Sequence, residues 1–307
     1  MPNGWSRPGS ANSYRRPVRR AVNAIGRFLV TAGLLLLLFV AYQLWGTGIY
    51  ESQQQSELNA KFQADLVENR QARQPVSGTT TTTTPAPPPA EGEPVGVIRI
   101  PKIGLERTIV QGVTVPDLRK GPGHYPDSPM PGQIGNAAIA GHRTTYGQPF
   151  NRIDELVPGD EISIVTLTGT FRYTVTEQLI VSPHDVQVLD PTPDATLTLT
   201  SCHPKYSSRQ RIVVKAKLNV EASPPPVKPP KGSVKHRRLA VDDLAGRRES
   251  RTPVWWAGLI VAAVGGLWWF AFHRRPRWYV WVAGAIPFLA VYAVFCFYLE
   301  RVLPPGF

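Results

Sequence analysis

Three segments of this 307-residue chain carry no charged side chain over 19 residues or more, and they constrain its fold more than any other feature. They are residues 28–46, 254–272 and 278–299. As an α-helix, 19 residues cover about 30 Å, the thickness of the hydrocarbon core of a bilayer. Tryptophans and tyrosines stand at the ends of the last segment, as in the aromatic belts of membrane proteins. We therefore expect one N-terminal and two C-terminal transmembrane helices.

Each segment has an alternative interpretation. A cleaved signal peptide would explain the first, but Gln43, Leu44 and Trp45 make a poor small-residue cleavage site, and the apolar run is long for a signal peptide. A buried helical hairpin of a soluble domain would explain the other two, but such helices normally keep a polar face and these have none. An uncleaved anchor and a membrane hairpin account for all three segments.

Basic residues beside these segments predict the topology. Residues 1–27 hold six arginines and no acidic residue, and residues 273–277 hold three arginines. Because basic flanks of membrane helices stay on the cytoplasmic side, we expect a basic cytoplasmic tail over residues 1–27 and a cytoplasmic loop over residues 273–277. Residues 47–253 then lie outside the cell, and residues 300–307 form a short tail.

The net charge of +12 belongs to these flanks and to residues 224–253, which hold eight Lys or Arg against three acidic residues. Residues 95–223, by contrast, hold 13 basic and 12 acidic residues. The basic runs lack interleaved aromatic residues, so no nucleic-acid partner is expected. The basic stretch before the second membrane segment has two open interpretations, contact with anionic headgroups or wall polymers, and a solubilising linker.

Composition divides the outer segment into three parts. Residues 47–94 include six consecutive threonines and many prolines, which predicts a Thr/Pro-rich spacer without a core of its own. Residues 223–253 form a second, Pro-rich basic linker. Between them, residues 95–222 have the length of one domain and alternate short apolar runs with Gly, Pro and Asp turns, which predicts a mainly β barrel or sandwich. The expected strands are residues 95–100, 136–141, 161–167, 171–181, 195–202 and 211–220.

The chain has two cysteines, too few for a disulfide framework or a four-thiolate zinc site. Cys296 lies in the last membrane segment. In the strand expected over residues 195–202 the leucines should face the core, so period-two alternation places Cys202 on the opposite face, exposed at the strand end. If the next strand is antiparallel, Arg211 shares that face. A guanidinium beside a thiol can donate hydrogen bonds to an acyl oxyanion.

A thiol nucleophile also needs a proton carrier, which is usually histidine. His142 ends an apolar run at a glycine, which would present it at a strand end. The other five histidines fit less well, because they point away from Cys202, sit in proline-rich turns or lie outside the domain. They are His203, His124, His184, His236 and His273. Spacing alone leaves the site open, since exposed histidines and arginines are common.

Two motifs make the domain recognisable. Residues 198–202 read TLTSC and are followed by Arg211 at the start of an apolar strand, and residues 121–143 read GPGHYPDSPMPGQIGNAAIAGHR. Together they resemble the sortases, and the short spacing from Cys202 to Arg211 is most similar to the class E, actinobacterial type. The resemblance covers residues 95–220 and implies an eight-stranded sortase β-barrel outside the membrane.

The resemblance also implies an activity. Sortases cut a C-terminal sorting signal between Thr and Gly of an LPxTG-like motif, hold the substrate as a thioester and pass it to a cell-wall amine; for class E the implied motif has Ala at its second position. Ser201 stands where Thr is usual, which keeps the hydroxyl. The implied catalytic residues are His142, Cys202 and Arg211, with Arg209 as the alternative to Arg211, and the implied substrate-binding residues are Thr200 and Ser201.

The expected partners are secreted proteins bearing C-terminal sorting signals, an amine of peptidoglycan or of its lipid-linked precursor, and membrane lipids. No cofactor and no metal is expected, because acidic residues 154–155 and 160–161 fit a solvated turn better than a calcium site. The expected location is the membrane of a Gram-positive, actinobacterial-like cell, with multiple spans and an extracellular catalytic domain.

Two alternatives stay open, a pilin-polymerising or hydrolytic sortase and a non-enzymatic barrel that binds extracellular partners. Residues 47–94 lack an Asp-Pro-aromatic lid motif, which argues against pilin polymerisation. Two C-terminal spans, however, are unusual for a housekeeping sortase, whereas pilin-polymerising sortases often carry a C-terminal span.

Overall fold

A computed structural model describes residues 15–72, 88–230, 252–274 and 278–302. The chain divides into two compact units, Met1–Gln43 and Leu44–Phe307. In the first, α1 (Arg15–Ala41) contains the apolar helical stretch Ile25–Ala41. A short π-helix, Tyr42–Gly46, follows it in the chain.

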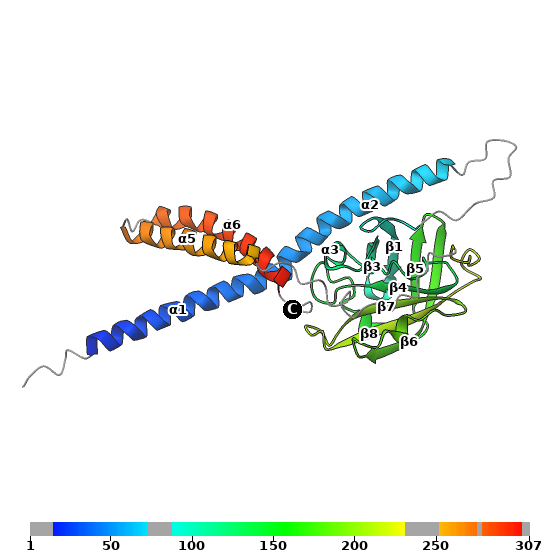
Figure 1. Cartoon of the computed structure of the whole chain (residues 1–307), viewed down its shortest axis with the longest axis horizontal. Helices are drawn as coiled ribbons and strands as arrows, with labels where there is room; N and C mark the ends of the chain where they lie inside the picture. Colours follow the sequence, from blue (N-terminus) through cyan, green and yellow to red (C-terminus); the bar gives the residue numbers. More distant parts are fainter. Residues whose placement is uncertain (1–14, 73–87, 231–251, 275–277, 303–307) are drawn as a thin grey trace, which may run out of the picture. The chain divides into compact units, whose positions relative to one another are not determined.

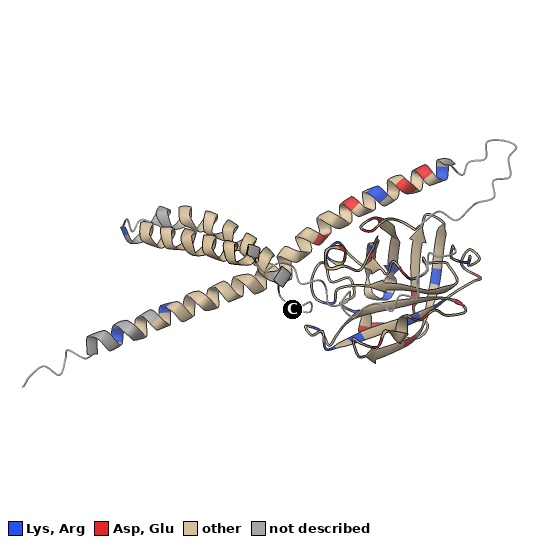
Figure 2. Cartoon of the chain, viewed as in Figure 1, with Lys and Arg blue, Asp and Glu red and all other residues tan. Residues whose placement is uncertain are grey.

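Two further helices, α5 (Thr252–Arg274) and α6 (Trp278–Val302), carry the C-terminal apolar segments. Each contains a stretch long and apolar enough to cross a membrane, Pro253–Phe272 and Val282–Leu299. Figure 2 shows almost no charged residue along either helix. These stretches and the shorter one in α1 agree with the three predicted spans.

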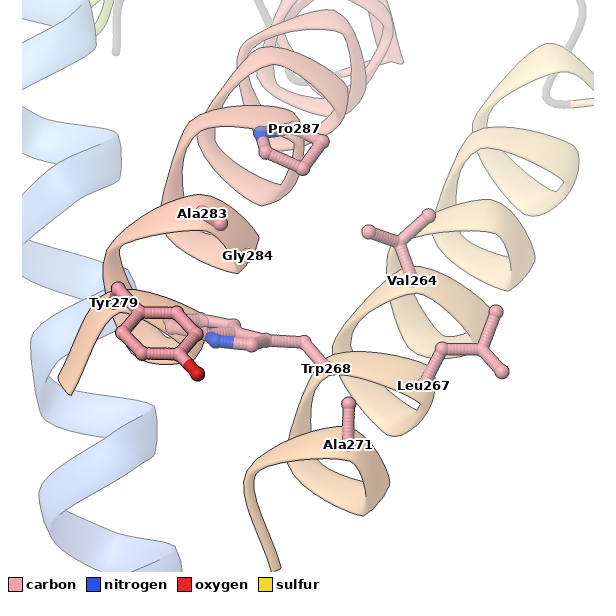
Figure 3. A pocket seen from close by; sticks show the side chains of 8 residues that line it. All are labelled: Val264, Leu267, Trp268, Ala271, Tyr279, Ala283, Gly284 and Pro287. Carbon is pink, nitrogen blue, oxygen red and sulfur yellow. The ribbon is translucent and has the colours of Figure 1, made fainter. Parts of the chain in front are cut away.

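Glycines let α5 and α6 approach each other, because an aromatic side chain of one helix packs over a glycine of the other. These pairs are Gly258 with Phe295, Gly265 with Phe288, and Gly284 with Trp268. Between the helices lies an open cavity of about 540 Å³, lined by apolar side chains and Tyr279 and bounded by Trp268 and Pro287 (Figure 3). Close packing of small against large residues is typical of helix pairs in lipid.

Eight strands close into a barrel in the order β1-β2-β3-β4-β7-β8-β6-β5 (Figure 1). The pairs β2/β3 and β4/β7 are parallel, and the other neighbouring pairs are antiparallel. The predicted fold class, a mainly β eight-stranded barrel, is confirmed. The strands are β1 Pro94–Ile100, β2 Leu105–Gln111, β3 Gly123–His124, β4 Gly135–Ala140, β5 Glu161–Thr166, β6 Gly169–Val181, β7 Ala195–His203 and β8 Gln210–Leu218. The short helices are α3 Val115–Leu118 and the 3-10 turns Pro101–Ile103, Ile153–Glu155 and Val186–Leu189.

Alternation along the strands fills the barrel. Leu197 and Leu199 of β7 are fully buried in the main core, as predicted. The opposite face of β4 and β7 is also covered, because Tyr125 and Ala140 belong to a second apolar cluster there. Thr198 is therefore buried although it points away from the main core, and these two strands are buried on both faces.

Two sequence expectations in the barrel differ from the structure. The strands β2 and β3 were not expected, because charged residues interrupt the apolar pattern of β2 and β3 has only two residues. The last strand, expected over residues 211–220, ends at Leu218, and Val220 beyond its end is 62% exposed.

The largest difference concerns residues 47–72, which form helix α2 (Thr47–Ala72) rather than part of a spacer. This helix packs against β1 and β2 (Figure 1). Its few apolar contacts bury Leu58 and Phe62. The remainder of the predicted spacer includes residues 73–87, which lie outside the described residues.

Polar contacts complete the docking of α2. The Gln55 side chain accepts a hydrogen bond from the Thr108 N–H (2.8 Å) and donates to the carbonyls of Thr108 (3.0 Å) and Lys120 (2.8 Å). Glu51, which is buried, forms an ion pair with Arg107 at 2.9 Å. Since these bonds reach the backbone of β2, the helix is fixed on the barrel at a definite position.

Candidate active site

The three predicted catalytic residues stand at the ends of three neighbouring strands. In the parallel pair β4/β7, Ala140 is opposite Thr200, so His142 and Cys202 each lie two residues beyond the last pair. In the antiparallel pair β7/β8, Cys202 is directly opposite Arg211. Neighbouring strands are about 4.8 Å apart, so the barrel brings the three residues together across one end of the sheet.

Hydrogen bonds between the residues that precede His142 and Cys202 join the two strand ends. The Gly141 N–H donates to the Thr200 carbonyl at 3.1 Å, and the Ser201 hydroxyl donates to the Gly141 carbonyl at 2.8 Å. Ser201 is buried, so its hydroxyl joins the two strands. Its predicted contact with substrate, like that of Thr200, stays a prediction.

Cys202 is half-buried, and its direct pairing with Arg211 puts both side chains on one face of the sheet. The Arg211 guanidinium donates from Nη1 to the carbonyls of Ser208 (3.0 Å) and Gln210 (3.2 Å). Among the described residues these are its only hydrogen bonds, so its other N–H groups have no protein acceptor there. Arg209, the alternative, is exposed on the loop between β7 and β8.

His142 has a ring nitrogen available for proton transfer. Its Nε2 is buried, and no described residue hydrogen-bonds it. Burial lowers the pKa of His142 to about 4, and the positive charge of Arg119 acts in the same direction. The imidazole is therefore neutral at pH 7 and can accept a proton.

His124 has the same pKa direction but a different role. Burial lowers its pKa to about 4, and its Nε2 bonds the Pro129 carbonyl while Nδ1 lies 2.9 Å from the Gln111 side-chain oxygen. Both ring nitrogens are therefore used inside the protein. Of the other histidines, His184 is exposed, His203 follows Cys202 in β7, His236 lies outside the described residues, and the side chain of His273 is not described.

Sequence reasoning did not identify Tyr125, which lies beside the same face. It is fully buried, and burial raises its pKa, while a hydrogen bond with Thr200 and the charge of Arg211 oppose that rise. Its place in the motif GHYP was the only signal in the sequence.

Arg143 was also missed, although it directly follows His142. It is buried, and it donates to the carbonyls of Asn151 (2.8 Å) and Cys202 (3.4 Å) and forms an ion pair with Asp154 at 2.8 Å. One side chain thus links the His142 loop to the backbone of Cys202. Asp154, considered above as part of an acidic turn, is a partner of this guanidinium.

Comparison with known proteins agrees with this arrangement. The family model described as "Sortase domain" matches residues 98–219. The chain is 34% identical over 220 residues to sortase SrtE1 of Streptomyces coelicolor, covering 66% of this chain and 58% of that protein. It is 33% identical over 186 residues to sortase D of Bacillus subtilis, covering 58% of this chain and 87% of that protein.

Among solved structures, the sortase D5 transpeptidase of Clostridium perfringens matches with 32% identity and a TM-score of 0.45, covering 55% of this chain and 98% of that one. The chain spans little more than half the length of the Streptomyces relative but most of the Bacillus one. The Bacillus sortase, 33% identical and matched over 87% of its length, establishes common descent of the domain. The chain therefore belongs to the sortase family.

Proposed function

We propose that this sortase is a cysteine transpeptidase in which Cys202 is the nucleophile, His142 the acid/base and Arg211 the oxyanion stabiliser. The observation that carries the proposal is the placement of the three residues at adjacent strand ends, with Cys202 directly opposite Arg211. Covalent catalysis needs a nucleophile, a proton carrier and a donor for the developing negative charge, and one residue of each kind stands there.

The proposed reaction has two acyl transfers. The Cys202 sulfur attacks the carbonyl carbon of the scissile peptide bond while its proton passes to His142 Nε2. The oxyanion accepts hydrogen bonds from Arg211; the C–N bond then breaks, the departing amine takes the proton from His142, and a thioester remains. An acceptor amine attacks the thioester, its proton passes through His142 to the leaving Cys202 sulfur, and a new amide is released.

The proposed substrates are secreted proteins with a C-terminal LAxTG- or LPxTG-like sorting signal, cleaved between Thr and Gly. The proposed acceptor is an amine of peptidoglycan or of its lipid-linked precursor. Both come from the class E resemblance, which the match to the Streptomyces sortase SrtE1 supports.

The proposed location is the cell membrane, with three spans and the barrel outside. Two long apolar helices and the arginines beside them support this topology. In intact cells, a thiol reagent that cannot cross membranes should label the wild-type chain and not Cys202→Ala. No labelling of the wild-type chain in intact cells, together with labelling after the cells are made permeable, would place the barrel inside.

The activity is tested with the full chain in detergent, a fluorogenic LAxTG peptide and its LPxTG counterpart, and triglycine as the amine. We expect a peptide–triglycine product and, without amine, a thioester adduct seen by mass spectrometry. Cys202→Ala should abolish both, and Arg211→Ala should lower kcat by roughly 10²-fold or more, whereas Arg209→Ala should not.

Absence of cleavage and of adduct by the wild-type chain would leave only a binding role. Release of free acid in the presence of amine would indicate a hydrolase.

A further inference from the structure

The orientation of the His142 ring is not set by a hydrogen bond at Nε2, since no described residue bonds that atom. An acid/base group nevertheless has to be held within a fraction of an ångström of its working position. Packing is the remaining means of fixing the ring, so the residue that lies against it is of interest.

The ring of Tyr146 lies against the imidazole. The two ring centroids are 5.4 Å apart and the planes are inclined by 32°. Tyr146 is buried, whereas His142 is half-buried. The imidazole therefore packs against the buried ring of Tyr146.

The backbone around Tyr146 is held in an unfavourable conformation. Tyr146 and Gln148 both have φ of 49°, in the left-handed region that side chains other than glycine rarely adopt. Gly147 between them has φ of 69°. Such a segment persists only where surrounding contacts determine it, and these contacts come from outside the loop.

The first five residues of α2 supply three of these contacts. Thr47 Oγ1 accepts a hydrogen bond from the Tyr146 N–H at 3.3 Å. Tyr50 packs edge-to-face on the Tyr146 ring, with centroids 6.2 Å apart. The Glu51 carboxylate lies so close to Gly147 that a Cβ there would collide with it.

Arg119 also lies against Tyr146, because its guanidinium carbon is 5.7 Å from the centroid of the Tyr146 ring. The helix itself cannot shift freely, because Gln55 and Glu51 fix it to the barrel. A continuous set of contacts therefore runs from the barrel wall through α2 and Tyr146 to His142.

We propose, on the basis of the function assigned above to His142, that Tyr146 is a positioning residue for the His142 ring and that the first five residues of α2 hold Tyr146 in place. In this arrangement α2 is part of the catalytic unit. Tyr146 touches the acid/base but not the reacting atoms, so it acts through His142.

The test measures kcat, KM and the pH profile of transpeptidation by the full chain in detergent. Tyr146→Ala should lower kcat roughly 10- to 100-fold with little change in KM, because a misplaced ring slows proton transfer. Water should also reach the imidazole, so the acidic limb of the pH profile should move up from about 4 towards 6.5. Tyr146→Phe, which keeps the ring, should restore kcat and the limb. Thr47→Val should show a smaller effect in the same direction.

A matched control lies on the same turn of the helix. Ile49 is 62% exposed, so Ile49→Ala should leave kcat and the pH profile unchanged. A wild-type kcat and acidic limb in Tyr146→Ala would overturn the proposal. If Tyr146→Ala does not fold, Thr47→Val takes its place as the test. An unchanged kcat and acidic limb of the pH profile in Thr47→Val would overturn the proposal. A lower kcat with a shifted acidic limb would support it.

His142→Ala, measured in parallel, separates this proposal from the function on which it rests. If His142→Ala keeps wild-type kcat, the assigned acid/base role fails. If His142→Ala is inactive while Tyr146→Ala behaves as wild type, only the positioning role fails.

Discussion

Among single residues, Arg143 combines burial, charge and position next to His142. Its guanidinium is almost completely buried, yet its acidic partner Asp154 is 44% exposed. Loss of the cation therefore leaves a carboxylate that water can solvate, but it also leaves the carbonyls of Asn151 and Cys202 without their donor. Most of the loss in stability should therefore come from these two carbonyls.

We expect Arg143→Met to lower the free energy of unfolding by about 2 kcal/mol, because buried carbonyls lose a charged donor. It should also lower kcat, since the carbonyl of Cys202 is released from the loop. Asp154→Asn is the matched control and should cost less than Arg143→Met, because the amide keeps an oxygen acceptor for the guanidinium and both carbonyls keep their donor. Urea denaturation measures the stability of each variant, and peptide kinetics measure its kcat. Equal urea midpoints for Arg143→Met and wild type would contradict the expectation.

At the scale of elements, the hairpin of α5 and α6 depends on which glycine faces its partner helix. A Cβ added at Gly265 would lie 3.2 Å from Phe288 Cε2, whereas one added at Gly266 would meet nothing within 4 Å. The two adjacent glycines thus form a natural pair of test and control positions.

Gly265→Leu should destabilise the hairpin by about 1–3 kcal/mol, because the larger side chain displaces Phe288 from its site. Gly266→Leu should have little effect on the packing. The melting of the full chain in detergent, followed by tryptophan fluorescence, reports the difference. A lower melting temperature for Gly266→Leu than for Gly265→Leu would mean that the helices pack through another face.

For the whole molecule, two histidines with lowered pKa values make stability depend on pH. His124 and His142 both have pKa values near 4 in the folded chain, below the value of about 6.5 in an unfolded one. Between pH 6.5 and 4 the unfolded chain therefore binds more protons than the folded chain. Stability is fully present above pH 6.5 and is lost as pH falls towards 4.

We expect the free energy of unfolding to fall between pH 7 and 4.5, with up to about 3 kcal/mol coming from the completely buried His124. His124→Gln should show a shallower dependence on pH than wild type, even if it is less stable at pH 7. Denaturant titrations at several pH values measure both slopes. Parallel slopes for the two proteins would assign the acid sensitivity to other groups.

Regular alternation made six of the eight barrel strands and the face of Cys202 predictable, because Leu197 and Leu199 mark the core side of β7. The pairing of Cys202 with Arg211 followed from the same alternation once an antiparallel connection was assumed. The docking of α2 was not predictable, since it depends mainly on polar contacts such as Gln55 to the β2 backbone. The contacts of Tyr146 and Arg143 likewise arise only when segments distant in the chain meet.

The docked helix changes what the threonine- and proline-rich tract does. Near one end of the tract, Asn69 of α2 donates a hydrogen bond to the Leu167 carbonyl of the barrel at 2.6 Å. Near the other, Gly92 and Glu93 are bonded to Gln111 of β2. Residues 73–87 therefore connect two points of the same folded unit, so lengthening them would leave both points in place. With residues 28–46 in the bilayer as proposed, α2 begins directly after that span at Thr47, so α2, and not the tract, is the part of the chain that joins the span to the barrel.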